Sequence, residues 1–358
     1  MKGLAVTHHG IEEVTSQEIN ELIGVSCKVK EGCAVFDFDR MEDLCLLCYK
    51  AQSVTRIINL LAEFKFTSFD DLVEKIKNVK IDSWLRKTFQ VKCSRIGEHP
   101  FNSQDVEKAV GENINGMVDF DNPDVLFFVY IYNDNAYFGV DFAGFDLAKR
   151  DYKIFSHPIS LKGPLAYSIV RLAKYKEGEV LLDPFCKDGT VAVEAALFAS
   201  RMPVNFYRKK NFAFSKFVDF DFGKADKAIK DATGIHAYDS QMRNVEAAKK
   251  NAKIAGVNKF ITFSKMDTEW LDTKLDKASV DKIVTNLPRA GKENVKFIER
   301  LYKEFFYQAE FVLKDKGLIV CVTNNTDILK KYADEYKFKA KETKEILGGQ
   351  LKAVILTK

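Results

Sequence analysis

Two aspartates and one asparagine each follow a short apolar run and could take part in chemistry. Asp183 follows residues 179–182, Asp239 follows residues 235–238, and Asn286 follows residues 281–285. In a sheet of parallel strands, such strand ends meet at the edge where ligands bind. A carboxylate there can accept hydrogen bonds from both hydroxyls of a ribose. An asparagine oxygen and a backbone carbonyl can together accept both N–H bonds of an exocyclic amine.

The elements around these residues predict an α/β domain. Strand 179–182, the loop 183–190 and helix 191–197 form the strand–loop–helix unit of doubly wound folds, although a single glycine loop also suits an ordinary turn. A second strand and helix over 235–255, strands over 260–263 and 281–285, a helix over 295–312 and a strand over 317–323 follow. Runs 338–346 and 351–357 flank Gly348-Gly349 as a closing antiparallel hairpin. We expect a Rossmann-like, mostly parallel sheet of seven strands.

The loop Asp183-Pro184-Phe185-Cys186-Lys187-Asp188-Gly189-Thr190 resembles the DPFCGSGT loop of amino-methylating S-adenosylmethionine enzymes. The helix from Asn244 to Gly256 and the Asn-Leu-Pro-Arg segment resemble further motifs of these class I methyltransferases. The resemblance implies S-adenosylmethionine as cofactor, with small residues such as Gly189 letting the backbone approach it. The cofactor-binding residues that it implies are Asp183, Pro184, Phe185, Cys186, Lys187, Gly189, Asp239 and Asp267.

The same resemblance implies that the target amine is held by Asn286, Leu287, Pro288 and Arg289. Proline stiffens this loop and removes a competing donor. The sequence departs from the family pattern at Lys187, where the family has glycine, at Asp188, where it has serine, and at Arg289, where it has an aromatic residue. Arg289 could stack on a base, contact phosphate or be a solvated loop residue.

The front half alternates short strands and helices and predicts an α+β region. Residues 1–60 are expected to form a ferredoxin-like subdomain and residues 61–150 an RNA-binding domain. Segments 94–97, 102–105, 118–119, 122–125, 139–144 and 149–152 resemble the THUMP module of RNA-modifying enzymes. Its strand supplies Lys92 and Arg95 as candidate RNA contacts; a connecting α+β domain is the alternative. Residues 151–158 are the expected linker to a methyltransferase domain over 151–358.

An insertion over residues 201–233 interleaves basic and aromatic residues, as nucleic-acid surfaces often do. Its cations Arg208, Lys209 and Lys210 are candidate RNA contacts; the alternative is that the aromatic residues pack on a sheet and the cations stay solvated. The amino-acid sequence of this insertion resembles that of archaeal tRNA and bacterial 23S ribosomal RNA guanine-N2 methyltransferases that carry a THUMP domain. The resemblance implies methyl transfer to the exocyclic N2 of a guanosine in tRNA. An RNA-binding paralogue without turnover is the alternative, and Lys187 and Arg289 are the discriminating residues.

Composition sets wider bounds. The 358 residues suggest two or three domains, and a net charge of +4 permits nucleic-acid binding without requiring it. No apolar run approaches the ~18 residues that cross a membrane.

Seven cysteines without regular spacing favour a reducing cytoplasm, and Cys45 and Cys48 are expected to pack in a core rather than bind metal. We expect a cytoplasmic monomer. A small-molecule or protein methyltransferase would leave the front half unexplained.

Overall fold

A computed structural model describes residues 1–347 and 349–358, which fold into two compact units. Unit 1 comprises Met1–His8, Thr15–Leu147 and Asn205–Ala225, and unit 2 comprises His9–Val14, Ala148–Val204 and Asp226–Lys358. The middle of the insertion therefore belongs to unit 1, although its sequence neighbours lie in unit 2. The boundary expected at residue 150 lies close to the end of unit 1 at Leu147.

Unit 1 is built on one mixed sheet of eight strands, ordered β2-β3-β1-β4-β8-β7-β5-β6. The boundary expected at residue 60 falls inside β4, which pairs with β1 on one side and β8 on the other. The strands are β1 Lys2–Thr7, β2 Cys27–Lys30, β3 Cys33–Asp37, β4 Val54–Lys65, β5 Thr88–Ile96, β6 Met117–Val118, β7 Val125–Tyr132 and β8 Asn135–Asp141. The helices are α1 Glu12–Ile23, α2 Met41–Lys50, α3 Phe69–Lys77 and α4 Ser103–Gly111.

Local sequence explains these elements. The apolar run of β7 is buried along almost its whole length, as expected for an inner strand. Asn102 caps α4 by accepting from the backbone of Gln104 and Asp105, which satisfies amide donors at the helix start. Cys45 and Cys48 on α2 are fully buried in the apolar core of this unit.

The insertion contributes aromatic side chains to the same core. Phe212 and Phe214 are buried, and their rings stack with centroids 4.7 Å apart. Asn205 Nδ2 donates to the carbonyl oxygen of Cys48 at 2.9 Å. Residues 206–208 and 213–216 form short 3₁₀ turns, and Phe222–Asp226 forms the short helix α7. Phe212 and Phe214 therefore behave as the alternative interpretation of the insertion expected, because their rings pack in the core.

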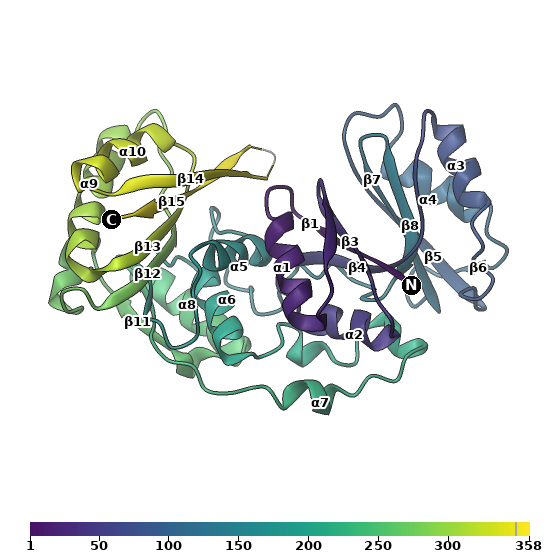
Figure 1. Ribbon diagram of the computed structural model, residues 1–358, viewed down its shortest axis with the longest axis horizontal. Coiled ribbons are helices and arrows are strands. Elements are labelled where there is room, and N and C mark those ends of the chain that lie inside the picture. The colour runs from purple at the N-terminus through teal and green to yellow at the C-terminus, as the bar shows by residue number, and fades with distance from the viewer. Residues whose placement is uncertain (348) are drawn as a thin grey trace. The chain divides into compact units, whose positions relative to one another are not determined.

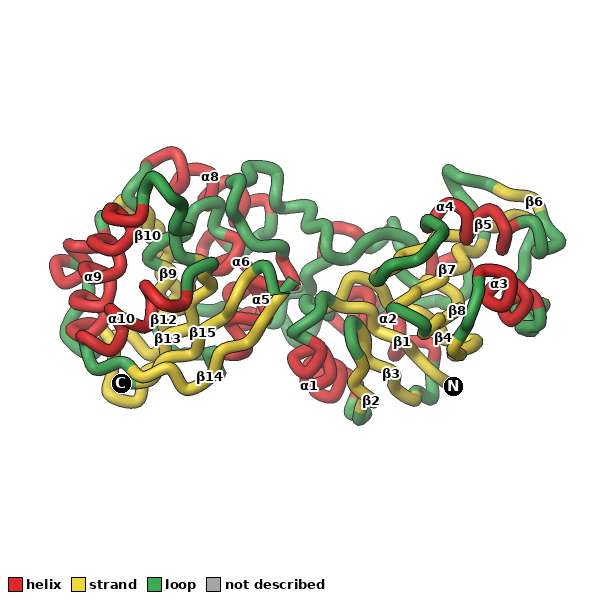
Figure 2. The backbone as a smooth tube through the Cα atoms, turned by 90° about the horizontal axis from the view of Figure 1, so that it is seen from above, coloured by secondary structure: helices red, strands yellow, loops and turns green. Residues whose placement is uncertain are grey.

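Unit 2 contains the expected seven-stranded sheet, ordered β11-β10-β9-β12-β13-β15-β14, with β15 antiparallel to both of its neighbours. Figures 1 and 2 show α9 and α10 on one face and α5, α6 and α8 on the other. The strands are β9 Leu181–Asp183, β10 Ile235–Asp239, β11 Ile261–Lys265, β12 Val280–Asn286, β13 Leu313–Thr323, β14 Lys339–Ile346 and β15 Leu351–Thr357. The helices are α5 Gly163–Leu172, α6 Thr190–Ser200, α8 Met242–Ile254, α9 Val295–Val312 and α10 Thr326–Glu335.

The predicted fold class is confirmed. The elements missed in this unit are the short 3₁₀ helices Asn258–Phe260 and Thr268–Thr273 and the helix α10. Helix α10 begins where the Asn325 side chain accepts from the backbone of Ile328, a capping signal that precedes a short polar helix. Of the expected hairpin loop, Gly348 lies outside the described residues. No helix in the described part of the chain has the length and apolar character needed to span a membrane.

Candidate active site

The loop between β9 and α6 is fastened to the neighbouring strand β10. The backbone N–H of Cys186 donates to the carbonyl oxygen of Tyr238 at 2.9 Å, and that of Lys187 donates to Asp239 Oδ2 at 3.0 Å. Gly189 ends the loop with φ +79, and a Cβ there would lie 2.7 Å from the Cβ of Ala248. Glycine at 189 is therefore required by its left-handed backbone and by the close approach of α8.

Asp239 is a buried carboxylate at the tip of β10 with three donors around it. Its Oδ1 accepts from the backbone of Gln241 at 3.0 Å and from Asn244 Nδ2 at 2.9 Å, and its Oδ2 accepts from Lys187 as above. A carboxylate has about four acceptor positions. The side chain is thus held in one orientation and retains capacity for a further donor.

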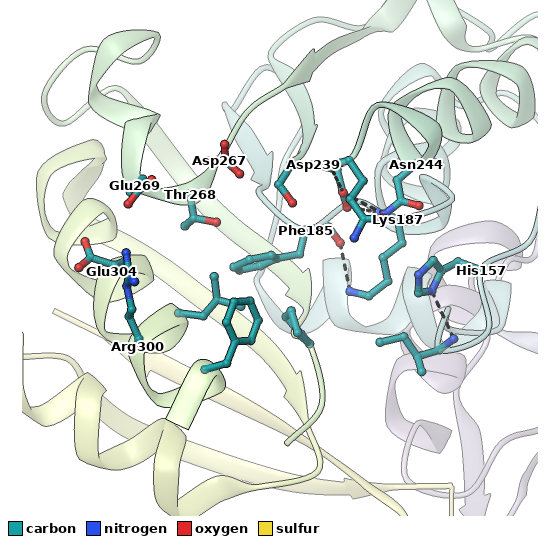
Figure 3. Close-up of a pocket in the computed structure, with 16 residues that line it drawn as sticks. His157, Phe185, Lys187, Asp239, Asn244, Asp267, Thr268, Glu269, Arg300 and Glu304 are labelled. Carbon is teal, nitrogen blue, oxygen red and sulfur yellow. Dashed lines mark hydrogen bonds between the residues drawn. The ribbon is translucent and has the colours of Figure 1, made fainter. Parts of the chain in front are cut away.

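Lys187 folds into the site instead of leaving it open, as the family glycine would. Its side chain is 6% exposed, and its φ of +51 is left-handed. Nζ donates to the carbonyl oxygen of Phe185 at 3.2 Å and to that of Asn286. Figure 3 shows the side chain running from near Asp239 toward Phe185, beside His157. Burial lowers the pKa of Lys187, because the charged form is poorly solvated there.

Asp183 is buried and does not line the cavity. Its Oδ1 accepts from Thr285 Oγ1 at 2.6 Å, which ties β9 to β12. Burial raises the pKa of Asp183 to about 7, and the hydrogen bond from Thr285 opposes this. Burial also raises the pKa of the neighbouring Cys186 thiol, with Asp183 adding to the effect, so the thiolate form of Cys186 is disfavoured.

The Asn-Leu-Pro-Arg segment divides into buried and accessible parts. Asn286 is 4% exposed, and its Nδ2 donates to the carbonyl oxygen of Ile159 at 2.7 Å. Leu287 is fully buried in the core of unit 2, whereas Pro288 lines the cavity and accepts from Tyr302 at 2.9 Å through its carbonyl oxygen. Arg289 does not line the cavity, and its Nε is buried without a hydrogen-bond partner among the described residues.

Asp188, the other departure from the family loop, organises the segment that holds Asn286. Its Oδ1 accepts from Ser160 Oγ at 2.7 Å, and its Oδ2 accepts from the backbone of His157 at 3.3 Å. These two residues flank Ile159, whose carbonyl oxygen receives the Asn286 amide. Asp188 thus acts on Asn286 through the backbone of residues 157–160.

The cavity at these strand ends measures about 410 Å³, within the range of small-molecule sites. Of the predicted cofactor and target residues, it brings together Phe185, Lys187, Asp239, Asp267 and Pro288. The others predicted for this site lie outside its lining and support or border it: Asp183, Pro184, Cys186, Gly189, Asn286, Leu287 and Arg289.

Sequence reasoning missed much of the remaining wall. Residues 297, 300, 301 and 304 all lie on one face of α9, a spacing that helical periodicity could have identified. Figure 3 shows Arg300 and Glu304 across the cavity from Asp239. His157 stood in the expected linker, where nothing in the sequence pointed to a site. The missed lining residues are His157, Ile159, Ser240, Gln241, Asn244, Thr268, Glu269, Phe297, Arg300, Leu301 and Glu304.

All five predicted RNA-contacting cations belong to unit 1. Arg95, on β5, lies 3.2 Å from His99 Nδ1 through its Nη1 atom. Arg208 lies over the ring of Phe145 at 4.5 Å, and Lys209 lies over that of Phe206 at 4.2 Å. Lys210 is exposed, and Lys92 is half-buried. The structure thus places these cations in one compact unit but packs two of them on aromatic rings.

Comparison with known proteins agrees with the fold. The chain is 28% identical over 369 residues to the tRNA (guanine(6)-N2)-methyltransferase of Methanocaldococcus jannaschii, covering 96% of this chain and 95% of that protein. A possible methylase from Clostridium difficile 630 has a TM-score of 0.82 and 25% identity, covering 99% of this chain and 96% of that chain. SMU.472, solved with S-adenosylhomocysteine, has a TM-score of 0.81 and 20% identity, covering 99% and 97%.

Family models account for both halves of the sequence. The THUMP domain model matches residues 66–141, within unit 1. The UPF0020 model, described as an RMKL-like methyltransferase domain, matches residues 150–353, more than half of the chain. This protein therefore belongs to the UPF0020 family of RMKL-like methyltransferase domains and carries a THUMP domain in front of it.

Proposed function

We propose that this protein transfers a methyl group from S-adenosylmethionine to the exocyclic N2 of a guanosine in tRNA. The observation that carries the proposal is that one cavity is lined by both Asp239 and Pro288. Pro288 lies two positions after Asn286 in the sequence. Asp239 suits a ribose and Pro288 belongs to an amine-holding loop. The relative from Methanocaldococcus jannaschii, similar over nearly the whole chain, carries this activity in its name.

The residues present fit the proposed cofactor. Asp239 is held by three donors and can accept from a ribose hydroxyl. Asp267 offers a second carboxylate, while Phe185 and Leu301 offer apolar surface to a planar base. When bound, S-adenosylmethionine supplies an electrophilic methyl group on a sulfonium. Asp239 and Asp267 would hold its nucleoside part.

Asn286 would orient the amine. With Nδ2 committed to Ile159, its Oδ1 is the end of the amide that can accept an N–H bond. Holding the amine in this way replaces a bimolecular encounter by a fixed approach. No general base is required, because the proton can leave after the methyl has moved. A covalent route through Cys186 is disfavoured, because its thiol is buried and its pKa is raised by that burial.

RNA recognition is proposed to rest mainly on unit 1, which contains the THUMP match and the cations Lys92, Arg95, Arg208, Lys209 and Lys210. Arginine and lysine neutralise phosphates, so binding should weaken with salt. We further propose a monomer that acts in the cytoplasm, where tRNA is modified.

Mass spectrometry of nucleosides tests the proposal. The full chain is incubated with S-adenosylmethionine and unmodified tRNA, and the RNA is digested to nucleosides. The expected product is N2-methylguanosine. A methyl group on another atom would refute the target, and the absence of methylation of any cellular RNA would favour an RNA-binding protein without turnover.

A further inference from the structure

Lys187 places a buried cation where the two loops of the site meet. Nζ donates to the carbonyl oxygens of Phe185, in the loop after β9, and of Asn286, at the end of β12. The side chain lines the cavity and is nearly excluded from solvent. Any positively charged group that enters near this junction therefore meets an ammonium in a weakly screening environment.

Several titratable groups surround this ammonium. Asp183 approaches from β9, Asp239 from β10, and Cys186 and Asp188 from its own loop. His157 faces it from the segment before α5, and the lysine charge helps lower the pKa of that imidazole, after burial. Both described acceptors of Nζ are uncharged carbonyl groups, while Asp183 and Asp239 favour the charged form of the lysine from nearby. Burial lowers the pKa of Lys187, the direction in which the proton is lost more readily.

We propose that Lys187 makes the cavity sensitive to the charge on the sulfur of its ligand. S-adenosylhomocysteine, a neutral thioether, binds with Lys187 protonated, whereas the sulfonium of S-adenosylmethionine binds after Lys187 has released its proton to solvent. This inference rests on the proposed function, which places the cofactor in this cavity. A sulfonium has no proton to lose, so the lysine is the partner that can relieve the repulsion. At low pH the product is consequently held more tightly than the substrate.

Calorimetry on the full chain in two buffers of different ionisation enthalpy measures the proton directly. Binding of S-adenosylmethionine should release close to one proton, and binding of S-adenosylhomocysteine none. Below the pKa of Lys187, affinity for S-adenosylmethionine should rise about tenfold per pH unit, while affinity for S-adenosylhomocysteine stays flat.

Two variants separate charge from shape. Lys187→Met keeps a long side chain without charge and should abolish both the proton release and the pH dependence. Lys187→Arg keeps a charge that cannot be lost and should increase the preference for S-adenosylhomocysteine at least tenfold. Both replacements carry a Cβ at φ +51, so backbone strain is common to all three proteins. If Lys187→Arg fails to fold, the wild type and Lys187→Met decide the question.

Equal proton release with both ligands would overturn the assignment. Release that persists in Lys187→Met would also overturn it and would point to Asp183 or His157 as the source. Failure of the wild type to bind either ligand at any pH would instead refute the proposed cofactor.

Discussion

The side chain of Asn286 is held by the backbone of Ile159, which accepts a hydrogen bond from Nδ2 at 2.7 Å. The two residues are 127 positions apart in the sequence. Because an amide can donate only through its nitrogen, this bond determines which end of Asn286 can accept. The orientation of the predicted amine acceptor is therefore imposed by the segment that precedes α5.

Asn286→Asp tests this orientation. A carboxylate cannot donate to Ile159, and repulsion between the two oxygens should turn it away. We expect kcat for methyl transfer to fall about 100-fold, the loss typical of removing one oriented group at a reaction centre. Affinity for S-adenosylmethionine, measured by calorimetry, should change less than about threefold, under 1 kcal/mol. Equal losses in rate and in cofactor affinity would show a structural effect instead.

Asp188→Ala should act on the rate through the 157–160 segment. The change removes one acceptor of Ser160 Oγ and the acceptor of the His157 backbone, which lets Ile159 move away from Asn286. It also removes the carboxylate that accepts from Thr190 at the start of α6. We expect kcat to fall about tenfold, near 1.4 kcal/mol, with KM for tRNA unchanged. Lys153→Met is the control, because it removes the ion pair with Asp188 at 3.6 Å and the hydrogen bond to the carbonyl oxygen of Leu161 but keeps the Asp188 carboxylate. A larger effect from Lys153→Met would contradict the role assigned to Asp188.

Asp239→Ala should weaken cofactor binding by roughly 1–3 kcal/mol, because it leaves polar groups unpaired. Part of that loss arises because Asp239 also accepts a hydrogen bond from the backbone N–H of Lys187, which the change leaves without this acceptor. Asn244→Ala provides a measure of the indirect part, since it removes one donor to Asp239 and keeps the carboxylate. The affinity for S-adenosylmethionine, measured by calorimetry, should be highest for the wild type, intermediate for Asn244→Ala and lowest for Asp239→Ala. Equal affinities for wild type and Asp239→Ala would refute the assignment.

Asp183→Asn should change the pH dependence of stability. The folded-state pKa of Asp183 is raised by burial from 3.8 to about 7, so folding favours its protonated form. Its contribution is fully present below about pH 4 and is lost as the pH rises through about 7. Asparagine does not titrate. Between these two pH values, the free energy of unfolding of the variant should therefore rise relative to that of the wild type by about 1.4 kcal/mol per pH unit. Urea unfolding at pH 5 and pH 8 measures the difference.

The matched control is Asp315→Asn, which changes a carboxyl whose side chain is 97% exposed. It should show no gain between the same two pH values. A gain as large as that of Asp183→Asn would mean that the effect reflects net charge rather than burial.

Lys210→Glu should weaken tRNA binding by the full chain. Lys210 is exposed within unit 1, so its charge is available to a phosphate. We expect the slope of log K against log salt to fall in magnitude by about 1. Lys277→Glu makes the same charge change at an exposed site in unit 2 and should have little effect. The same loss from both changes would argue against an interface centred on unit 1.

The amino-acid pattern by itself determined most elements of the fold. Helix α9 and strand β15 match the predicted bounds, and the order of strands and helices after residue 179 predicted the seven-stranded sheet with its antiparallel end. These features follow from hydrophobic periodicity, turn residues and motif spacing, which are local properties of the chain. The positions of Asp183 and Asp239 at the ends of their strands could be predicted for the same reason.

Only the tertiary structure decided what these residues touch. Gly189 is required by Ala248 on α8, Asn286 is oriented by Ile159, and the Lys187 ammonium lies against the carbonyl group of Asn286. The middle of the insertion joins unit 1 because Phe212 and Phe214 find an apolar core there. The contacts of Asn286 with Ile159 and of Lys187 with Asn286 join residues 127 and 99 positions apart. No local pattern encodes such pairings, because they depend on how the elements pack.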